Sequence, residues 1–302
     1  MAEQQRVLVP LDGSEVAEAA LPYAEAIARL VGGALRLLAV VEREPGGVFG
    51  LSPELSEEVE RGQREVFAAY LATIARELRD RGIVADTEMA MGHAADEILA
   101  AAERIAASMV VMATHGRGGL QRLFLGSVAD RVMRTGSQPT LLISPREDAP
   151  VRQAVQLRRI AVPLDGSPLA EAALAPAARL AAAAGARLVL LRVQSLPVMA
   201  TMAYQYVPDL GEIDAELEQL AQQYLEGVLG RLPAGVAADI AVIRGVPAAT
   251  LADYLQENAV DLVVMTTHGR GGVRRLALGS TADRLVRLGL PVLLIRAPEQ
   301  PS

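Results

Sequence analysis

The chain contains the same segment twice. Residues 6–21 read RVLVPLDGSEVAEAAL and residues 159–174 read RIAVPLDGSPLAEAAL, an offset of 153 residues (159 − 6). The same offset relates Gly126 to Gly279. One domain takes roughly 100 to 200 residues, so a repeat of this period in 302 residues predicts two copies of one module. We expect modules at residues 1–145 and 159–302, joined by a polar linker at 146–158 that lacks a core pattern.

Within each copy, short apolar runs alternate with segments of helical period. Strands are expected at 7–11, 35–41, 84–92, 109–116 and 139–145, and in the second copy at 160–164, 188–193, 240–245, 262–269 and 291–296. The helical segments of the first copy are 14–33, which has a glycine stop, 52–82, 94–107 and 127–136. This alternation predicts an α/β fold in which each module is a five-stranded parallel sheet, order 3-2-1-4-5, with helices on both faces.

Composition excludes several classes of protein. With 51% hydrophobic and 22% charged residues the chain is globular, and no apolar run approaches the roughly 20 residues that span a bilayer. The net charge of −7 disfavours binding to nucleic acid or to an anionic membrane. The start of the sequence lacks the pattern of a secretory signal, so we expect a cytoplasmic protein.

Certain cofactor chemistries are also excluded. There is no cysteine, and three histidines cannot build a histidine-rich metal site. None of the 29 basic residues is a lysine, which excludes a Schiff base and the lysine of a Walker-type phosphate loop.

Two strand ends carry the candidate site. Asp12 follows the first strand in the segment PLDGS, and the segment THG follows the fourth strand. Ligands of open α/β sheets bind beyond the carboxyl ends of the strands, so neighbouring first and fourth strands would bring both segments to one crevice.

A helix is predicted to begin at Gly126 and Ser127, and the free N–H groups of a helix start attract anions. Arg117 and Arg122 add positive charge, so the loop suits a phosphate. Two interpretations without a ligand stay open. SVAD at 127–130 and STAD at 280–283 are capping-box patterns, and Asp-Gly-Ser begins turns and helices by itself.

The glycine pattern carries a family resemblance. Gly116, nine residues and Gly126-Ser127 recur as Gly269, nine residues and Gly279-Ser280, each set behind a strand that ends in THG and paired with an early VPLDGS. The chain resembles the universal stress protein family in its tandem form, over residues 6–296. The resemblance implies Rossmann-like modules, related to adenine nucleotide α-hydrolases, that hold ATP without a Walker loop.

The resemblance also implies roles for single residues. The glycines and serines of the pattern would hold phosphates, Asp12 and Asp165 would contact the nucleoside, and the backbone of Val40 and Val193 would lie against adenine. The candidate binding residues are Pro10, Leu11, Asp12, Val40, Met112, Ala113, His115, Gly116, Arg117, Gly126, Ser127 and Val128, and in the second copy Pro163, Leu164, Asp165, Val193, Met265, Thr266, His268, Gly269, Arg270, Gly279, Ser280 and Thr281.

The sequence departs from the family pattern at one position. The first glycine of that pattern is Ala113 in the first copy and Thr266 in the second. Threonine is β-branched and bulkier, so we expect nucleotide to bind less well at the second site than at the first.

No catalytic residue is assigned. Asp, His and Ser occur together in each copy, but the serine lacks the G-x-S-x-G elbow of a nucleophile, which favours a loop role for His115 and His268. We expect a regulatory protein that binds ATP, with magnesium or manganese as an accompanying ion, and hydrolyses it slowly or not at all. The alternatives are a ligand-free scaffold and a slow ATP hydrolase.

The sequence also predicts contacts between the modules and between chains. The last strands, TLLIS and VLLIR, are expected to pair the two modules within the chain, and whole chains to form a homodimer. The signalling partner is not identified by the sequence. Residues 197–209 read as a lid or partner surface, or as a segment that packs on its own module.

Overall fold

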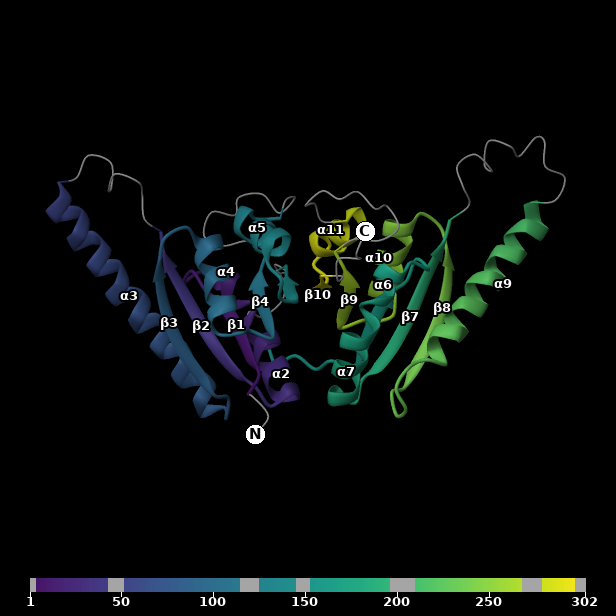
Figure 1. Ribbon diagram of the computed structural model, residues 1–302, viewed down its shortest axis with the longest axis horizontal. Helices are drawn as coiled ribbons and strands as arrows, with labels where there is room; N and C mark the ends of the chain where they lie inside the picture. The colour runs from purple at the N-terminus through teal and green to yellow at the C-terminus, as the bar shows by residue number, and fades with distance from the viewer. Residues whose placement is uncertain are drawn as a thin grey trace. The chain divides into compact units, whose positions relative to one another are not determined.

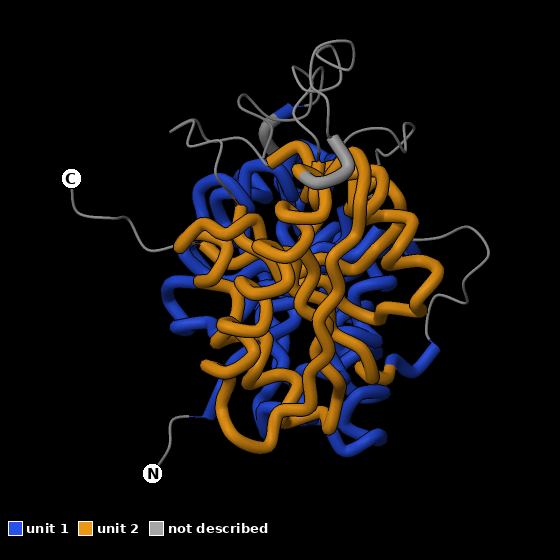
Figure 2. Tube along the Cα trace, turned by 90° about the vertical axis from the view of Figure 1, so that its right-hand side faces the viewer, with its two compact units in different colours: residues 1–155 blue, residues 156–302 orange. Residues whose placement is uncertain are grey.

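The computed structural model describes residues 4–42, 52–114, 125–144, 153–195, 210–267 and 279–296. The chain divides into two compact units, residues 1–155 and 156–302 (Figure 2). The expectations for residues 197–209 and for the two THG loops lie outside the described residues.

The first unit is built on a parallel sheet (Figure 1). Its strands are β1 (Arg6–Pro10), β2 (Ala34–Val41), β3 (Ala85–Met91), β4 (Met109–Ala113) and β5 (Thr140–Ile143). They lie in the order β3-β2-β1-β4-β5, and each neighbouring pair is parallel. The predicted order 3-2-1-4-5 is therefore confirmed.

Among the described residues of this unit, the helices are α1 (Glu15–Glu18), α2 (Leu21–Val31), α3 (Pro53–Asp80), α4 (Ala94–Arg104) and α5 (Ser127–Thr135). Right-handed crossovers put α1, α2 and α3 on one face of the sheet, and α4 and α5 on the other. Both α3 and α4 pack on β2 and β3, and α4 also packs on α5, as two helices on the same face do.

The second unit repeats this arrangement. Its strands are β6 (Arg159–Pro163), β7 (Arg187–Gln194), β8 (Ala238–Arg244), β9 (Leu262–Thr266) and β10 (Val292–Ile295), in the order β8-β7-β6-β9-β10. Its helices are α6 (Pro168–Glu171), α7 (Leu174–Ala184), α9 (Leu210–Leu229), α10 (Pro247–Glu257) and α11 (Ser280–Arg287). The duplication read from the sequence is thus a duplication of the fold.

The first strand of each unit is buried on both faces. Val7, Leu8 and Val9 are all 0% exposed, as a continuous apolar run predicts for a central parallel strand. Burying an aliphatic side chain of this size contributes about 1.5–3 kcal/mol, so these runs anchor each core.

The single helix expected at residues 14–33 is wrong, because the chain forms α1 and α2 instead. Pro22 has no N–H with which to reach the carbonyl of Glu18, and its ring clashes with the carbonyl four residues back. The predicted glycine stop is present, since Gly32 ends α2 in the left-handed conformation at φ 60°.

The end of the expected linker lies against the second unit. Leu157 is buried, and the backbone N–H groups of Arg158 and Arg159 both donate to Oδ2 of Asp261, at 2.7 and 2.8 Å. These bonds fix the residues that lead into β6.

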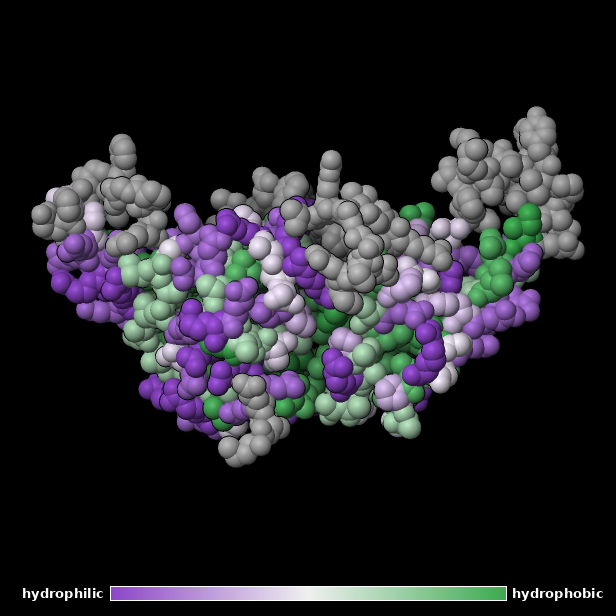
Figure 3. All heavy atoms as spheres, in the orientation of Figure 1, coloured by the Kyte–Doolittle hydropathy of each residue, from purple (hydrophilic) through white to green (hydrophobic). Residues whose placement is uncertain are grey.

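The surface of α3 is rich in hydrophilic residues (Figure 3). None of the helices in the described part of the chain has the length and apolar content needed to cross a membrane.

Candidate functional site

A hydrogen-bonded turn leaves β1 at the carboxyl edge of the sheet. Oδ1 of Asp12 accepts from the backbone N–H of Ser14 at 3.0 Å and from its hydroxyl at 2.6 Å. Oγ of Ser14 in turn accepts from the N–H of Ala17 at 3.1 Å and caps α1. Gly13, at φ 78°, supplies the left-handed backbone that folds the aspartate back onto the serine.

The second unit has the same turn. Oδ1 of Asp165 accepts from the N–H and the hydroxyl of Ser167, at 2.9 and 2.6 Å, and Ser167 caps α6 through the N–H of Ala170. Each aspartate is therefore held by its own chain, as the turn-and-helix interpretation of Asp-Gly-Ser expects. A structural role and a binding role are compatible, because a carboxylate has two oxygens and about four acceptor positions.

The strand register brings three candidate segments to one level of the edge. Pro10 lies opposite Leu38, so Asp12 and Val40 are each two residues beyond that pair. Leu8 lies opposite Val110 on β4, so the same counting puts Thr114 level with Asp12. The expectation that the first and fourth strands are neighbours is confirmed.

A backbone hydrogen bond returns the chain from the start of α5 to the end of β4. The N–H of Gly126 donates to the carbonyl oxygen of Thr114 at 2.9 Å, and Ser127 begins the helix directly afterwards. The first N–H groups of α5 consequently lie at the carboxyl edge, beside the strand that neighbours β1.

The second unit makes the equivalent bond. The N–H of Gly279 donates to the carbonyl oxygen of Thr267 at 3.2 Å, and α11 begins at Ser280. A methyl group added at Gly279 would lie 3.3 Å from that same oxygen, a tight contact. The glycine therefore permits a close approach within its own chain, in addition to any approach of a ligand.

The capping-box interpretation of residues 127–130 is wrong. The cap of α5 is Gly126, which has no side chain to accept a bond, and Ser127 is already the first helical residue. Asp130 accepts from Arg134 at 2.8 Å instead of reaching back. The second copy behaves alike, with Gly279 as the cap and Asp283 bonded to Arg287. The hydrogen bond from Gly126 to Thr114 places the first helical residue at Ser127. This is one residue earlier than a capping box with Ser127 as its cap predicts.

The candidate residues differ in exposure. Leu11, Met112, Ala113, Leu164 and Thr266 are buried, so only their backbone could face a ligand. Partly exposed candidates are Pro10, Asp12, Val40, Gly126, Val128, Pro163, Asp165, Val193, Met265, Gly279 and Thr281, whereas Ser127 and Ser280 are exposed. The candidates His115, Gly116, Arg117, His268, Gly269 and Arg270 lie outside the described residues.

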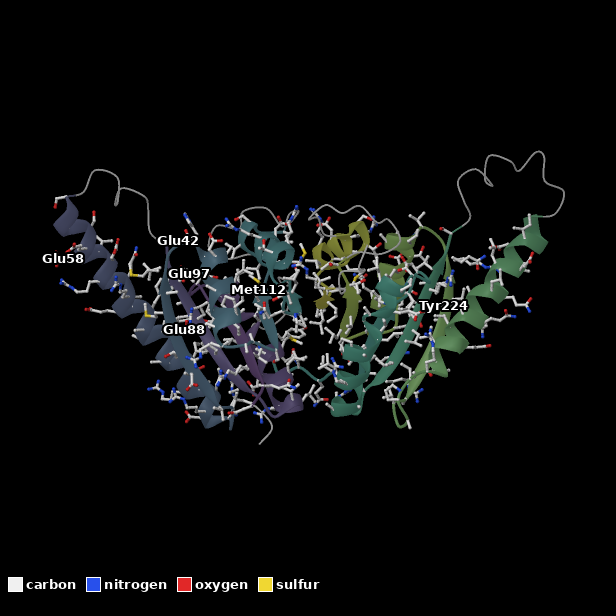
Figure 4. The ribbon with its side chains drawn as sticks, viewed as in Figure 1. Glu42, Glu58, Glu88, Glu97, Met112 and Tyr224 are labelled. Carbon is white, nitrogen blue, oxygen red and sulfur yellow. The ribbon has the colours of Figure 1, made fainter. Side chains whose placement is uncertain are left out.

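A tyrosine on the long helix of each unit was not predicted. The hydroxyl of Tyr224 donates to Glu171, at the end of the helix that Ser167 starts, and burial followed by this bond raises the pKa of Tyr224. The guanidinium carbon of Arg192 lies 4.8 Å from the centre of its ring. Figure 4 shows Tyr224 between α9 and the sheet.

The first unit contains the matching pair, in which Tyr70 donates to Glu18 at 3.0 Å. Helical periodicity indicates that Tyr70 faces inward, but it does not reveal its partner Glu18, which is 52 residues away in the chain. The repeat is the only signal in the sequence for these pairs, since both copies contain them.

In the described ranges no three His, Cys, Asp or Glu side chains gather in a way that could hold an ion.

The two units are doubly wound α/β modules, and each brings a helix start and an aspartate turn to the carboxyl edge of its sheet. This is the class of fold that binds ligands at a switch in strand order. The model of the universal stress protein family matches residues 4–144 and 156–296. The chain belongs to that family.

Individual relatives extend the match to the whole chain. A universal stress protein of Mycolicibacterium smegmatis is 29% identical over 309 residues, covering 98% of both chains. One from Methanocaldococcus jannaschii is 33% identical over 140 residues, covering 46% of this chain and 81% of its own. The solved universal stress protein of Archaeoglobus fulgidus has a TM-score of 0.69 at 21% identity, covering 97% of this chain and 96% of its own, and supports the fold.

Proposed function

We propose that each module binds one adenine nucleotide, ATP, and that the protein acts in a stress response as a nucleotide-binding regulator. The observation that carries this proposal is the bond from Gly126 to Thr114, which returns the start of α5 to the sheet edge. Unpaired N–H groups and the positive end of the helix dipole there favour phosphate. Gly279 and Thr267 make the same bond in the second module.

The nucleoside half would lie over β1 and β2. Asp12 and Val40 share one level of the edge, so a ribose at the carboxylate and an adenine along the Val40 backbone would follow the sheet. Asp165 and Val193 offer the same arrangement in the second module, because Pro163 lies opposite Leu191. The glycines of the phosphate loop, Gly116 and Gly269, would complete the two sites.

Hydrolysis is proposed to be slow or absent. None of the described candidate residues is a histidine that could act as a general base, and Oδ1 of each aspartate already accepts two bonds. A magnesium or manganese ion would be held mainly by the phosphates and water, which is common for Mg²⁺.

A ligand-free scaffold is the second candidate function. The observation that favours it is the aspartate turn, whose bonds to Ser14 and Ser167 give both aspartates a structural reason to be present. Pairing of the two modules through β5 and β10, and dimerisation of whole chains, remain proposals for either function.

The test is to denature the purified protein and chromatograph the small molecules that it releases. Close to two ATP or ADP molecules per chain support the proposal, and close to one supports it for a single module. If none is released, titration of the protein with ATP and magnesium follows, read by calorimetry. Absence of binding there rejects the nucleotide site and leaves the scaffold.

A further inference from the structure

A groove lies between α3 and the edge strand β3 of the first module. Its volume is about 380 Å³, near the lower end of the range of roughly 300–1,000 Å³ for small-molecule sites. Its lining is mainly apolar, and it consists of Arg64, Glu65, Ala68, Met89 and Met91.

The repeat identifies the equivalent positions of the second module. Tyr70 and Tyr224 make the same bond to Glu18 and Glu171, which aligns α3 with α9 at an offset of 154 (224 − 70). The edge strands β3 and β8 align at 153, from Met91 to Arg244. In the second module, Glu218 therefore occupies the position equivalent to Arg64, and Arg244 occupies the position equivalent to Met91.

In the second module these two positions form an ion pair that ties α9 to β8. Arg244 pairs with Glu218, and its Nη1 also lies 2.7 Å from Oδ2 of Asp214. Nε2 of Gln194 donates to Oδ1 of Asp214 at 2.9 Å, which ties β7 into the same network. Charged and polar groups thus bridge the helix and the strands.

In the first module the same two positions also touch, but with different chemistry. The guanidinium of Arg64 donates to the thioether sulfur of Met91, which is a weak acceptor. Val41 stands where Gln194 closes the network (194 − 153). No ion pair involves Arg64 among the residues that the structure describes. The helix and the strand are left with an apolar gap beside a cation that lacks a carboxylate.

We propose that this groove binds a small amphipathic anion, a free fatty carboxylate of medium chain length. The carboxylate would bind Arg64, whose planar fork suits a bidentate contact. The alkyl chain would lie along Ala68, Met89 and Met91, since methionine side chains adapt to irregular apolar shapes. Glu65 is the one acidic side chain of the lining, and its charge confines the head group to the Arg64 side.

The experiment titrates the full chain with dodecanoate, below its micellar concentration, by calorimetry. We expect saturable binding of one molecule per chain. In the double variant Arg64→Glu/Met91→Arg, which installs the residue pair of the second module, we expect binding to be lost. That pair already joins a helix and a strand in α9 and β8, so the variant should fold, and an unchanged melting temperature verifies this.

Two further measurements separate charge from apolar contact. Arg64→Gln should weaken dodecanoate binding about tenfold, as loss of a charge-assisted hydrogen bond predicts. The uncharged dodecanol should bind to the unaltered chain about as weakly as dodecanoate binds to this variant. Arg61→Gln is the matched control, because Arg61 is on the same helix and pairs with Glu58 outside the groove. It should leave binding unchanged.

Three outcomes would overturn the proposal. They are no saturable binding to the unaltered chain, equal binding to the folded double variant, and equal binding of dodecanoate and dodecanol. Met91 is the last residue of β3 and lies opposite Val41, next to Val40 of the proposed nucleotide site. An ATP titration of the double variant therefore distinguishes a loss of dodecanoate binding from a failure of the nucleotide proposal.

Discussion

Oδ1 of Asp12 lies 2.6 Å from Oγ of Ser14, and Oδ1 of Asp165 lies at the same distance from Oγ of Ser167. In each module one carboxylate oxygen thus holds the serine that caps the next helix. The aspartate is part of the local structure before any ligand arrives, so its structural and binding contributions must be measured separately.

Asp12→Asn and Asp12→Ala separate these contributions. Asparagine keeps an acceptor oxygen for Ser14, so we expect the free energy of unfolding to stay within about 0.5 kcal/mol, whereas alanine should cost about 1–2 kcal/mol through the disrupted cap. Urea denaturation measures both. Calorimetry with ATP should show weakened binding at the first module for both variants. Equal destabilisation by asparagine and alanine would contradict the role of the turn.

Gly126→Leu tests the proposed phosphate-binding site at the start of α5. A large side chain there would fill the space beside the first N–H groups of the helix, so nucleotide released per chain should fall by the share of the first module. Chromatography after denaturation measures the loss. Unchanged release from the folded variant would reject backbone approach as the mechanism.

The two modules differ at Ala113 and Thr266, which allows a reciprocal exchange. If the β-branched threonine hinders the second site, Thr266→Ala should strengthen ATP binding there, and Ala113→Thr should weaken it at the first site by roughly the same factor. Calorimetry resolves the two sites. Both side chains are buried, so each variant needs a melting curve beside its binding curve. If neither variant changes the ATP affinity of its site, threonine is not the reason for any difference in affinity between the two sites.

Two glycines in the long helices, Gly62 in α3 and Gly227 in α9, have open space where a methyl group would be added. Glycine inside a helix costs about 0.5–1 kcal/mol relative to alanine. We therefore expect Gly62→Ala and Gly227→Ala each to raise the free energy of unfolding by about that amount, measured in urea. A loss of stability would mean that a neighbour occupies the space.

Tyr224→Phe tests the bond between α9 and Glu171. Burial, and then the bond to Glu171, raises the pKa of Tyr224 above its ordinary value, while Arg192 acts in the opposite direction. The neutral phenol therefore makes its full contribution to stability below a pH of about 10, which is the pKa of tyrosine in an unfolded chain. This contribution is lost as the pH rises toward the pKa of Tyr224 in the folded chain.

At pH 7 we expect the variant to be about 1–2 kcal/mol less stable than the unaltered chain in urea. Above pH of about 10 the difference should narrow, because only the unaltered chain loses the contribution of this phenol. A difference that is constant from pH 7 to 11 would contradict the assignment.

Local sequence determined much of this protein. The repeat of residues 6–21 at 159–174 revealed two modules, and the buried run of Val7, Leu8 and Val9 and the stop at Gly32 follow from neighbours in the chain. Apolar period and left-handed glycine are short-range effects, so they can be read without knowing the fold. The aspartate turn at Asp12 belongs with them.

Only the tertiary structure decided the rest. The start of α5 depends on a bond from Gly126 to Thr114, and the pairing of Tyr70 with Glu18 joins residues far apart in the chain. The contact of Arg64 with Met91 leaves a groove, although the equivalent pair in the second module carries opposite charges. Such contacts depend on which helix covers which strand, and the energies of local segments do not contain that information.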